Sequence, residues 1–279
     1  CPFVHTVDSS TSDSKPPVQG LIHWADEARA QAFEAWLQAQ TPVHDLKPHT
    51  LRAASADASF RRYFRVDTSA GSLIVMDAPP DKEDCHPFVA VARQLEAGGV
   101  RVPHILQWDE AQGFMLLSDL GTHTLLSTLD TQAPMAPGNR ERYLAAIDEL
   151  VRLQQVSGAD RVPPYDDALL QRELDLLPQW YLTQLRGLTL DTATTDMLNK
   201  TFGLIKAQVL GQPKVLVHRD YHSRNLMAHP EDAGARLGVI DFQDAVWGPI
   251  TYDLVSLLRD AYVMWDEDVQ IDYAVRYWE

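Results

Sequence analysis

Several residue types are scarce in this sequence, and each shortage excludes a class of protein. Two cysteines, Cys1 and Cys85, are too few for a disulfide framework, so reduced thiols in a cytoplasm are expected. No apolar run reaches the roughly 18 residues of a membrane-spanning helix, and no signal-peptide core is present. Basic residues number 24 against 39 acidic ones, a net charge of −15, which argues against binding nucleic acid or an anionic membrane through the general surface.

The length of 279 residues suits two domains or one fold with two lobes, at about 150 residues for each. Residues 1–20 include a polar run of Ser, Thr, Asp, Lys and Pro, and we expect them to be a disordered tail. Residues 21–118 predict a small mixed lobe, and residues 119–279 predict a larger, mainly helical lobe. The expected fold class is therefore α+β, with an antiparallel sheet in the small lobe.

Hydrophobic periodicity and turn residues predict the order of the elements. Apolar residues at helical spacing predict helices over 26–40, 87–97, 141–156, 167–185 and 194–210, with a helical pattern resuming at 252. Aromatic, β-branched and other apolar residues between turn signals predict strands over 60–66, 73–76, 100–108, 113–117, 214–217, 225–228 and 237–240.

The residues that suggest chemistry lie between positions 215 and 253. Asp220 follows a short apolar strand, where a carboxylate can face a cleft rather than the core. Asn225 comes five residues later and Asp241 sixteen residues after that, so a hairpin can bring these two side chains together. Amide and carboxylate oxygens suit Mg²⁺, and Asp220 is left to orient a hydroxyl and accept its proton. This division of roles predicts phosphoryl transfer.

The same window resembles a known superfamily. His218-Arg219-Asp220 through Asn225 fits the H-x-D-x-x-x-x-N catalytic loop of protein-kinase-like enzymes, and Asp241-Phe242-Gln243 stands where D-F-G stands. His222, two residues after Asp220, makes the pattern D-x-H-x-x-N. This pattern resembles the aminoglycoside-phosphotransferase and choline-kinase branch, whose substrates are small molecules. The resemblance implies a bilobal protein-kinase-like fold that uses ATP and Mg²⁺. It also implies Asp220 as catalytic base, with Asn225 and Asp241 as metal ligands.

Three neighbouring residues are interpreted as structural support for this loop. His218 is expected to hydrogen-bond the segment around Asp241, and His222 to pack within the loop. Asp253, near the start of the helical pattern after residue 251, is expected to anchor the catalytic loop through the loop's backbone or His222 and not to bind the substrate.

The resemblance also predicts nucleotide contacts in the small lobe. Residues 58–66 fall where the phosphate-covering hairpin should be, although G-x-G-x-x-G is absent. Small residues and arginines there still allow backbone N–H groups and positive charge to approach phosphate. Backbone groups near 117–120 are expected to bind adenine at a hinge between the lobes. The nucleotide-binding candidates are Ser59, Phe60, Arg61, Arg62, Leu117, Asp119 and Leu120.

Asp77 stands near the end of the strand on which the kinase lysine is expected. The lysine–glutamate ion pair of the superfamily is therefore not carried over to this chain. Three cationic substitutes stay open, namely Arg62, Arg65 and Lys82, and a fourth possibility is that the phosphates are held without this contact.

A closer resemblance covers about residues 51–279. Runs at 59–65, 76–84 and 173–181, together with the catalytic loop, are similar to the bacterial N-acetylmuramate/N-acetylglucosamine anomeric kinases of peptidoglycan recycling. This implies ATP-dependent phosphorylation of the sugar C1 hydroxyl by a cytoplasmic protein, which we expect to be a monomer. A sugar pocket combines an aromatic wall with a few polar groups. The substrate-binding candidates are Glu173, Trp180, Arg219, Arg224 and Asp244.

Two other functions remain open at this point. A kinase of the same fold could act on another small alcohol of the aminoglycoside, choline or homoserine type, and Trp247 with Tyr252 could imitate a cage for a choline cation. A nucleotide-binding pseudokinase is the alternative from a different class, and Asp77 in place of lysine is its only motive. The presence of Asp220, Asn225 and Asp241 argues against it.

Overall fold

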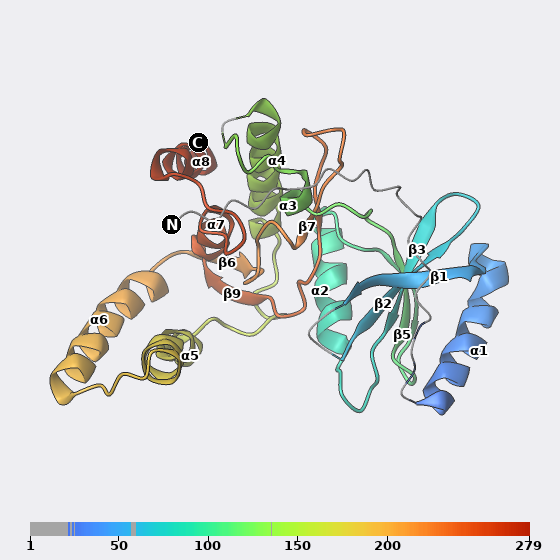
Figure 1. The fold of residues 1–279 in the computed structure, drawn as a ribbon, viewed down its shortest axis with the longest axis horizontal. Helices are drawn as coiled ribbons and strands as arrows, with labels where there is room; N and C mark the ends of the chain where they lie inside the picture. The colour runs from blue at the N-terminus through green and yellow to red at the C-terminus, as the bar shows by residue number, and fades with distance from the viewer. Residues whose placement is uncertain (1–21, 23, 25, 57–59, 135) are drawn as a thin grey trace, which may run out of the picture.

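The computed structural model describes residues 22, 24, 26–56, 60–134 and 136–279, and its first half is built on an antiparallel sheet (Figure 1). The expected tail at residues 1–20 and the candidate Ser59 lie outside the described residues. Five strands follow the order β1-β2-β3-β5-β4, and every neighbouring pair is antiparallel. They are β1 (Lys47–Ala56), β2 (Arg62–Asp67), β3 (Ser72–Asp77), β4 (Ile105–Asp109) and β5 (Phe114–Ser118). The predicted α+β class with an antiparallel sheet is confirmed.

Two helices cover opposite faces of this sheet (Figure 1). On one face, α1 (Glu27–His44) packs the Phe33 ring 5.3 Å from Phe64 and 5.5 Å from Phe114, measured between ring centroids. On the other face, α2 (His86–Ala97) shares a buried cluster with Met76 and with residues of the helical half. Successive side chains of a strand point to opposite faces, so β3 contributes Val75 to the α1 side and Met76 to the α2 side.

Asp77, the last residue of β3, belongs to the α1 face of the sheet. Its carboxylate accepts hydrogen bonds from Arg29 Nε at 3.0 Å and Nη2 at 2.6 Å, and from Arg62 Nε at 2.9 Å. Arg29 lies on α1 and Arg62 begins β2, so the carboxylate joins the helix to the sheet. The buried negative charge of Asp77 is therefore compensated by two guanidinium groups, one hydrogen-bonded to each carboxylate oxygen.

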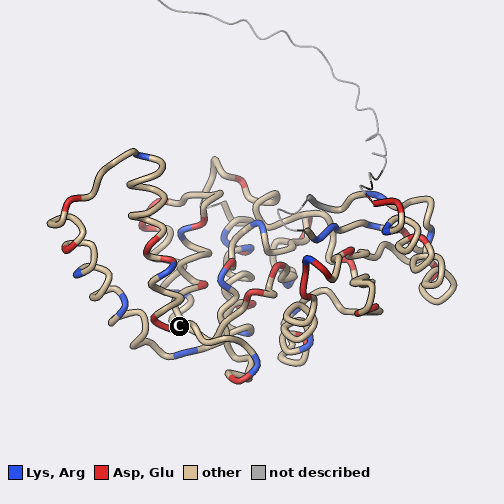
Figure 2. Tube along the Cα trace, turned by 90° about the horizontal axis from the view of Figure 1, so that it is seen from below, with Lys and Arg blue, Asp and Glu red and all other residues tan. Residues whose placement is uncertain are grey.

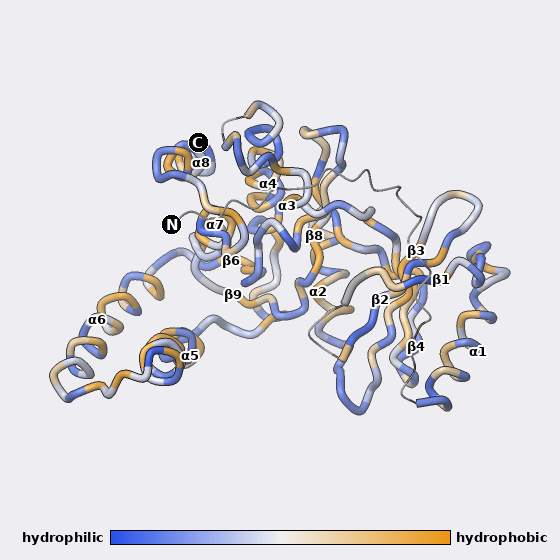
Figure 3. The backbone as a smooth tube through the Cα atoms, viewed as in Figure 1, coloured by the Kyte–Doolittle hydropathy of each residue, from blue (hydrophilic) through white to orange (hydrophobic). Residues whose placement is uncertain are grey.

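The second half of the chain is mainly helical, and hydrophobic residues recur along its helices and along the sheet strands (Figure 3). The central helix is α4, which buries Tyr143 and Leu150 and stacks the Tyr143 ring 4.8 Å from Tyr273. The helices of this half are α3 (Leu125–Thr128), α4 (Pro137–Gln154), α5 (Asp167–Leu176), the π-helix η1 (Leu177–Leu185), α6 (Thr192–Leu210), α7 (Tyr252–Leu258) and α8 (Glu267–Trp278).

Two short antiparallel strand pairs carry the chemistry-bearing loops of this half. Strand β6 (Lys214–Val217) pairs with β9 (Val246–Pro249), and β7 (Leu226–Met227) pairs with β8 (Gly238–Val239). The catalytic-loop motif connects β6 to β7, and the Asp241 segment connects β8 to β9. These two loops lie about twenty residues apart in sequence, and the pairing of β7 with β8 brings Asn225 of one beside Asp241 of the other.

Several elements differ from the sequence prediction. Strand β1 was not predicted as a strand, because Lys, Pro, His and Ala give it little β propensity; it forms at the sheet edge by pairing with β2. The helix predicted over 167–185 is an α-helix only to Leu176 and continues as a π-helix around Pro178, which lacks an N–H. The strand predicted over 100–108 begins only at Ile105.

Acidic and basic residues are interspersed along the described trace (Figure 2). Within the described residues, the acidic side chains are therefore spread over many elements rather than gathered in one segment. Among the described residues, none of the helices has the combination of length and hydrophobicity that crossing a membrane requires.

Candidate active site

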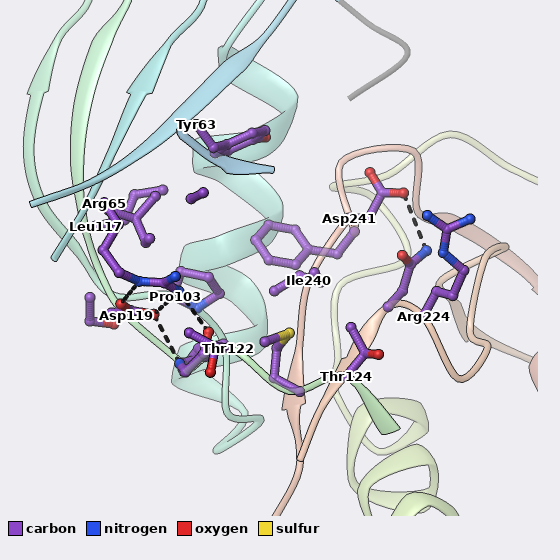
Figure 4. A pocket seen from close by; sticks show the side chains of 18 of the residues that line it. Tyr63, Arg65, Pro103, Leu117, Asp119, Thr122, Thr124, Arg224, Ile240 and Asp241 are labelled. Atoms are coloured by element: carbon purple, nitrogen blue, oxygen red, sulfur yellow. Dashed lines mark hydrogen bonds and ion pairs between the residues drawn. The ribbon is translucent and has the colours of Figure 1, made fainter. Parts of the chain in front are cut away.

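A cavity of about 760 Å³ lies between the sheet and the loops that join β6 to β7 and β8 to β9 (Figure 4). Ile74 and Leu117 contribute from the sheet, and Phe88 contributes from α2. The segment from Ser118 to Thr124 lines one end. The opposite end holds the chemistry-bearing residues of both loops: Asp220, His222, Arg224, Asn225, Ile240, Asp241 and Phe242, with Tyr262 beside them. The structure therefore brings the predicted base and both predicted metal ligands into one cavity.

The catalytic loop is held by a buried carboxylate behind it. Asp253 Oδ2 accepts the His218 N–H at 2.7 Å, and Oδ1 accepts the Arg219 N–H at 3.0 Å. Arg219 has φ +78°, a left-handed backbone conformation that costs free energy in a residue with a Cβ. These two hydrogen bonds stabilise the sharp turn that directs Asp220 toward the cavity.

His218 joins the two loops through both ring nitrogens. Its Nε2 donates to the Ile240 carbonyl at 3.0 Å, and its Nδ1 accepts the Asp220 N–H at 3.3 Å. Burial lowers the pKa of His218, so the ring is neutral at physiological pH, as this hydrogen-bonding pattern requires. The ring fixes the backbone before Asp241 relative to the backbone of Asp220.

Substitution of Asp253 tests this support. Burial raises the pKa of Asp253 to about 7, although hydrogen bonds from His218 and Arg219 oppose the shift. In Asp253→Asn, one backbone N–H keeps an oxygen acceptor and the other faces an amide N–H. We expect unfolding free energy to fall by about 1–3 kcal/mol, the cost of one unsatisfied buried donor, measured by urea unfolding. The exposed Asp266→Asn, whose side chain makes no helix-capping hydrogen bond, is the control and should change stability by less than about 0.5 kcal/mol. An equally stable Asp253→Asn would contradict the anchoring role.

Asn225 and Asp241 lie in contact at the cavity end. Asn225 Nδ2 donates to Asp241 Oδ2 at 3.2 Å and to the Asp220 carbonyl at 3.0 Å, while Gln243 Nε2 donates to Asp241 Oδ1 at 2.8 Å. Asp241 is exposed and has φ +65°, again left-handed, which turns its side chain out of the strand direction. The Asn225 carbonyl accepts the Ile240 N–H at 3.0 Å, so the backbone also fixes this pair.

The donor set fits a hard divalent cation. Asn225 supplies an amide oxygen and Asp241 a carboxylate, and both line the same cavity wall. In the part of the chain that the structure describes, no group of three or more His, Cys, Asp or Glu side chains could hold a metal. Two oxygen ligands with the rest of the shell supplied by phosphates and water are typical of Mg²⁺ sites and not of zinc sites.

At the other end of the cavity, Asp119 fixes the segment between sheet and helices. Its carboxylate accepts Arg65 Nη2 at 3.0 Å, Ser72 Oγ at 2.7 Å and the Gly121 N–H at 2.9 Å. Burial alone would raise the pKa of Asp119, but these hydrogen bonds and the Arg65 charge outweigh it and lower the pKa. Leu117, Asp119 and Leu120 all line the cavity. Their predicted contact with adenine stays a prediction.

The structure does not bring Phe60, Arg61 and Arg62 to the described cavity wall. Phe60 is 60% exposed and its N–H donates to Glu83 Oε1 at 3.0 Å. Arg61 Nε lies 3.5 Å from Glu83, and Arg62 pairs with Asp77 on the opposite face of the sheet. Tyr63 and Arg65 line the cavity instead. The alternation of side chains along β2 is the signal that could have identified them.

The structure also shows where Asp77 and the three suggested substitutes for the kinase lysine lie. Asp77 does not face the cavity at all; Ile74, three residues earlier on β3, lines it. Of the three suggested substitutes, Arg62 faces α1 and Lys82 is exposed beside the Phe60 ring. Arg65 lies in the cavity, but its guanidinium is bound by Asp119.

The sugar-binding candidates divide into three groups. Glu173 and Arg219 form an ion pair at 3.0 Å, and Tyr165 and Tyr252 donate to the other Glu173 oxygen at 2.5 Å and 3.2 Å. Asp244, which is exposed, acts on the Arg219 charge and raises its pKa together with Glu173, against the effect of burial. Trp180 is 63% exposed on η1 and does not line the cavity described above.

Arg224 is the one substrate candidate in the lining of this cavity. It forms a third group with two residues that the sequence did not single out, Asp260 and Tyr262. Asp260 accepts the Ser223 N–H and the Tyr262 N–H, both at 2.8 Å. Tyr262 lies beside the Arg224 guanidinium and the His222 ring, at 4.8 Å and 5.4 Å from its ring centroid. No motif marks Asp260 in the sequence, because its contacts are made across the fold.

Comparison with known proteins gives consistent matches. Residues 50–279 match the model of the phosphotransferase enzyme family. The chain is 44% identical over 263 residues to an N-acetylmuramate/N-acetylglucosamine kinase of Pseudomonas aeruginosa, covering 91% of this chain and 75% of that protein. A kinase of the same name from Neisseria meningitidis is 42% identical over 245 residues, covering 88% and 70%.

Solved structures match in fold. The GDP complex of wild-type aminoglycoside 2'-phosphotransferase-IIIa superposes with a TM-score of 0.62 at 17% identity, covering 89% of this chain and 83% of that chain. A choline/ethanolamine kinase family protein from Mesorhizobium loti gives a TM-score of 0.60 at 20% identity, covering 90% and 76%. At these identities the likeness shows the fold alone.

Proposed function

The chain belongs to the phosphotransferase enzyme family, and on that premise we propose that it transfers the γ-phosphoryl group of ATP to the C1 hydroxyl of N-acetylglucosamine and N-acetylmuramate. We further propose that the enzyme acts in the cytoplasm in the recycling of peptidoglycan sugars. The proposed lobes meet at residues 118 and 119, beside the end of the cavity where adenine is expected.

One observation carries the proposal. Asp220 lies in the same cavity as the Asn225–Asp241 pair, and the Asp119 segment lines the far end (Figure 4). A nucleotide with its base near Leu117 and Asp119 would extend its phosphates toward Asn225 and Asp241. An acceptor hydroxyl beside Asp220 would then face the terminal phosphate. Positioning of this kind supplies most of the catalysis in phosphoryl transfer.

In the proposed step, the phosphoryl group passes directly from ATP to the sugar. An oxygen lone pair of the C1 hydroxyl forms a bond to the γ-phosphorus, and the bond from that phosphorus to the β–γ bridging oxygen breaks. The electron pair of the broken bond goes to that oxygen, which leaves as part of ADP. The hydroxyl proton passes to the Asp220 carboxylate and from there to solvent. Since an anomeric hydroxyl is more acidic than an ordinary alcohol, the Asp220 carboxylate needs only to orient it and accept the proton late.

Asn225 and Asp241 are the residues that would hold Mg²⁺. When bound, the cation neutralises charge on the phosphates and lowers the cost of building negative charge on the leaving oxygen. The backbone hydrogen bonds of the loop and the His218 ring keep Asp220 at a fixed position relative to this pair.

Sequence relatives favour the sugar over other alcohols. The relatives at 42–44% identity carry one name, N-acetylmuramate/N-acetylglucosamine kinase, whereas the aminoglycoside and choline enzymes match at 20% identity or less. Asp77 was the only motive for the pseudokinase alternative, and it bonds Arg29 of α1 outside the cavity lining. Asp220, Asn225 and Asp241 all line the cavity, which favours a kinase over a pseudokinase. Tyr252, one of the two residues of the suggested choline cage, donates its hydroxyl to Glu173.

The proposal is tested by ADP release with a panel of acceptors. We expect turnover with N-acetylglucosamine and N-acetylmuramate in the presence of Mg²⁺, and none above background with choline or kanamycin. The 1-O-methyl glycoside of N-acetylglucosamine is the matched control, because it lacks only the free C1 hydroxyl. Turnover of the methyl glycoside would contradict C1 transfer, and turnover of choline or kanamycin alone would overturn the sugar assignment.

A further inference from the structure

The cavity needs a positive charge that its sheet wall does not provide. Triphosphate carries about four negative charges at neutral pH, and Asp220 and Asp241 add two carboxylates at the reactive end. Asn225 and Ile74 are uncharged, so a cation other than Mg²⁺ must come from elsewhere in the lining. Among the described residues that line the cavity, the arginines are Arg65 and Arg224.

Arg65 is occupied at the far end. Its Nη2 donates to Asp119 Oδ1 at 3.0 Å and to the Gly121 carbonyl at 2.8 Å, and its Nε also bonds the Asp119 carboxylate. The two side chains form a neutral pair, with side-chain exposures of 13% and 7%. This arginine fixes the hinge segment and has little net charge to offer the phosphates.

Arg224 has the opposite character. It lies directly before Asn225 in the loop, and Asn225 contacts Asp241. Figure 4 shows Arg224 at the Asp241 end of the cavity and away from Arg65 and Asp119. In the part of the chain that the structure describes, its guanidinium makes no hydrogen bond or ion pair. Its nitrogen donors remain available to an anion that enters the cavity.

The position of Arg224 is set by an aromatic support. The guanidinium carbon lies 4.8 Å from the centroid of the Tyr262 ring, within the range of a cation–π contact. The Tyr262 backbone is held by Asp260, which also accepts the N–H of Ser223, the residue before Arg224. One buried carboxylate therefore orients both the arginine and the ring beneath it.

We propose that Arg224, supported by Tyr262, binds the oxygens of the transferred phosphoryl group and supplies the charge that β3 lacks. The inference rests on the proposed kinase function and specifies a residue role within it. A planar guanidinium can donate two parallel hydrogen bonds to phosphate, and its charge counts most where negative charge develops. Arg224 is then a catalytic residue, and Tyr262 and Asp260 are positioning residues.

A second anion could reach the same guanidinium. N-acetylmuramate carries a lactyl carboxylate that N-acetylglucosamine lacks, and a carboxylate also accepts two hydrogen bonds from arginine. The location of Arg224 next to Asn225 favours the phosphate, because Asn225 is a proposed ligand of the phosphate-bound cation. The two sugars distinguish the sources, since both receive the same phosphoryl group and only one brings a carboxylate.

The experiment compares kcat and KM for both sugars in Arg224→Gln, Arg224→Lys, Tyr262→Phe and Tyr262→Ala. Arg224→Gln should lower kcat about 100-fold or more with both sugars equally, and Arg224→Lys should restore part of it. Tyr262→Phe keeps the ring and should retain most of the wild-type kcat. Tyr262→Ala removes the ring and should lower kcat about threefold. Arg140→Gln, an exposed arginine on α4, is the matched control and should be unchanged.

Nucleotide affinity gives a readout that does not depend on the sugar. With Mg²⁺ present, Arg224→Gln should weaken binding of a non-hydrolysable ATP analogue about tenfold and leave ADP binding nearly unchanged, because only the γ-phosphate contact is lost. A loss of activity with N-acetylmuramate alone would assign Arg224 to the carboxylate and overturn the proposal. Unchanged kcat and unchanged analogue affinity would also overturn it. If the wild type phosphorylates neither sugar, the proposed function fails while the nucleotide measurement still tests Arg224.

Discussion

Replacing Asp220 by asparagine is expected to lower kcat by about 10²–10⁴-fold, the contribution of a positioned general base. The amide retains the size of the side chain but cannot accept the hydroxyl proton. The loop should keep its shape, because Asp220 joins it through backbone groups: its N–H donates to His218 Nδ1, and its carbonyl accepts Asn225 Nδ2 and the His222 N–H. The measurement is steady-state kinetics with N-acetylglucosamine, with Mg²⁺–nucleotide affinity determined in parallel.

The matched control for this prediction is Asp196→Asn, an exposed aspartate on α6 outside the cavity lining. It should leave both kcat and nucleotide affinity unchanged. A variant Asp220→Asn with wild-type kcat would show that another group accepts the proton. A variant that lost nucleotide affinity as strongly as kcat would show that Asp220 binds the metal or phosphates instead.

Replacing Asp77 by alanine is expected to lower the free energy of unfolding by about 3–5 kcal/mol, the cost of removing one partner from a buried ion pair. Asp77 is 0% exposed, and its loss leaves Arg29 and Arg62 as neighbouring like charges between α1 and the sheet. The measurement is urea unfolding followed by circular dichroism. At a temperature where the variant is folded, affinity for Mg²⁺–nucleotide should equal that of the wild type.

Asp67→Ala is the matched control on the same sheet. Asp67 also pairs with an arginine, Arg52, but the two side chains are 38% and 39% exposed, so the loss should be about 1 kcal/mol or less. A comparable cost for the two variants would contradict the buried clamp. A drop in nucleotide affinity in folded Asp77→Ala would contradict the orientation of Asp77 away from the cavity.

That Asp220, Asn225 and Asp241 meet could be predicted from the sequence because these residues are close along the chain. Asp220 and Asn225 share one loop, and Asp241 follows a short strand that pairs back onto the next one. The spacing therefore determines which side chains can meet, and the structure brings these three into one cavity. Their chemical roles stay proposals until the variants are measured.

The nucleotide wall could be predicted only in part, because strand register was not established. A shift of one residue along β2 exchanges the two faces of the sheet. Phe60, Arg61 and Arg62 were chosen by their composition, whereas Tyr63 and Arg65 reach the cavity. Asp77 was compared with a lysine by its position in the sequence, and Ile74 is the β3 residue that lines the cavity.

The long-range supports of the loop that carries Asp220 could be predicted only in part. Asp260 stabilises the catalytic loop through Ser223, 37 residues earlier, and Asp253 through His218, 35 residues earlier. Asp253 was proposed from a family resemblance, but no local pattern distinguishes Asp260 from a surface aspartate. Strand β1 shows the same limit, because pairing with β2, and not its own propensity, makes it a strand.

The most direct test of the account is the position of the phosphate on the product. Wild-type protein, ATP and Mg²⁺ are incubated with N-acetylglucosamine, and the product is observed by ³¹P and ¹H NMR. We predict a phosphate signal split into a doublet by the anomeric proton, since the phosphate is then attached at C1. A phosphate coupled to protons of another carbon, with the anomeric hydroxyl still free, would contradict the account.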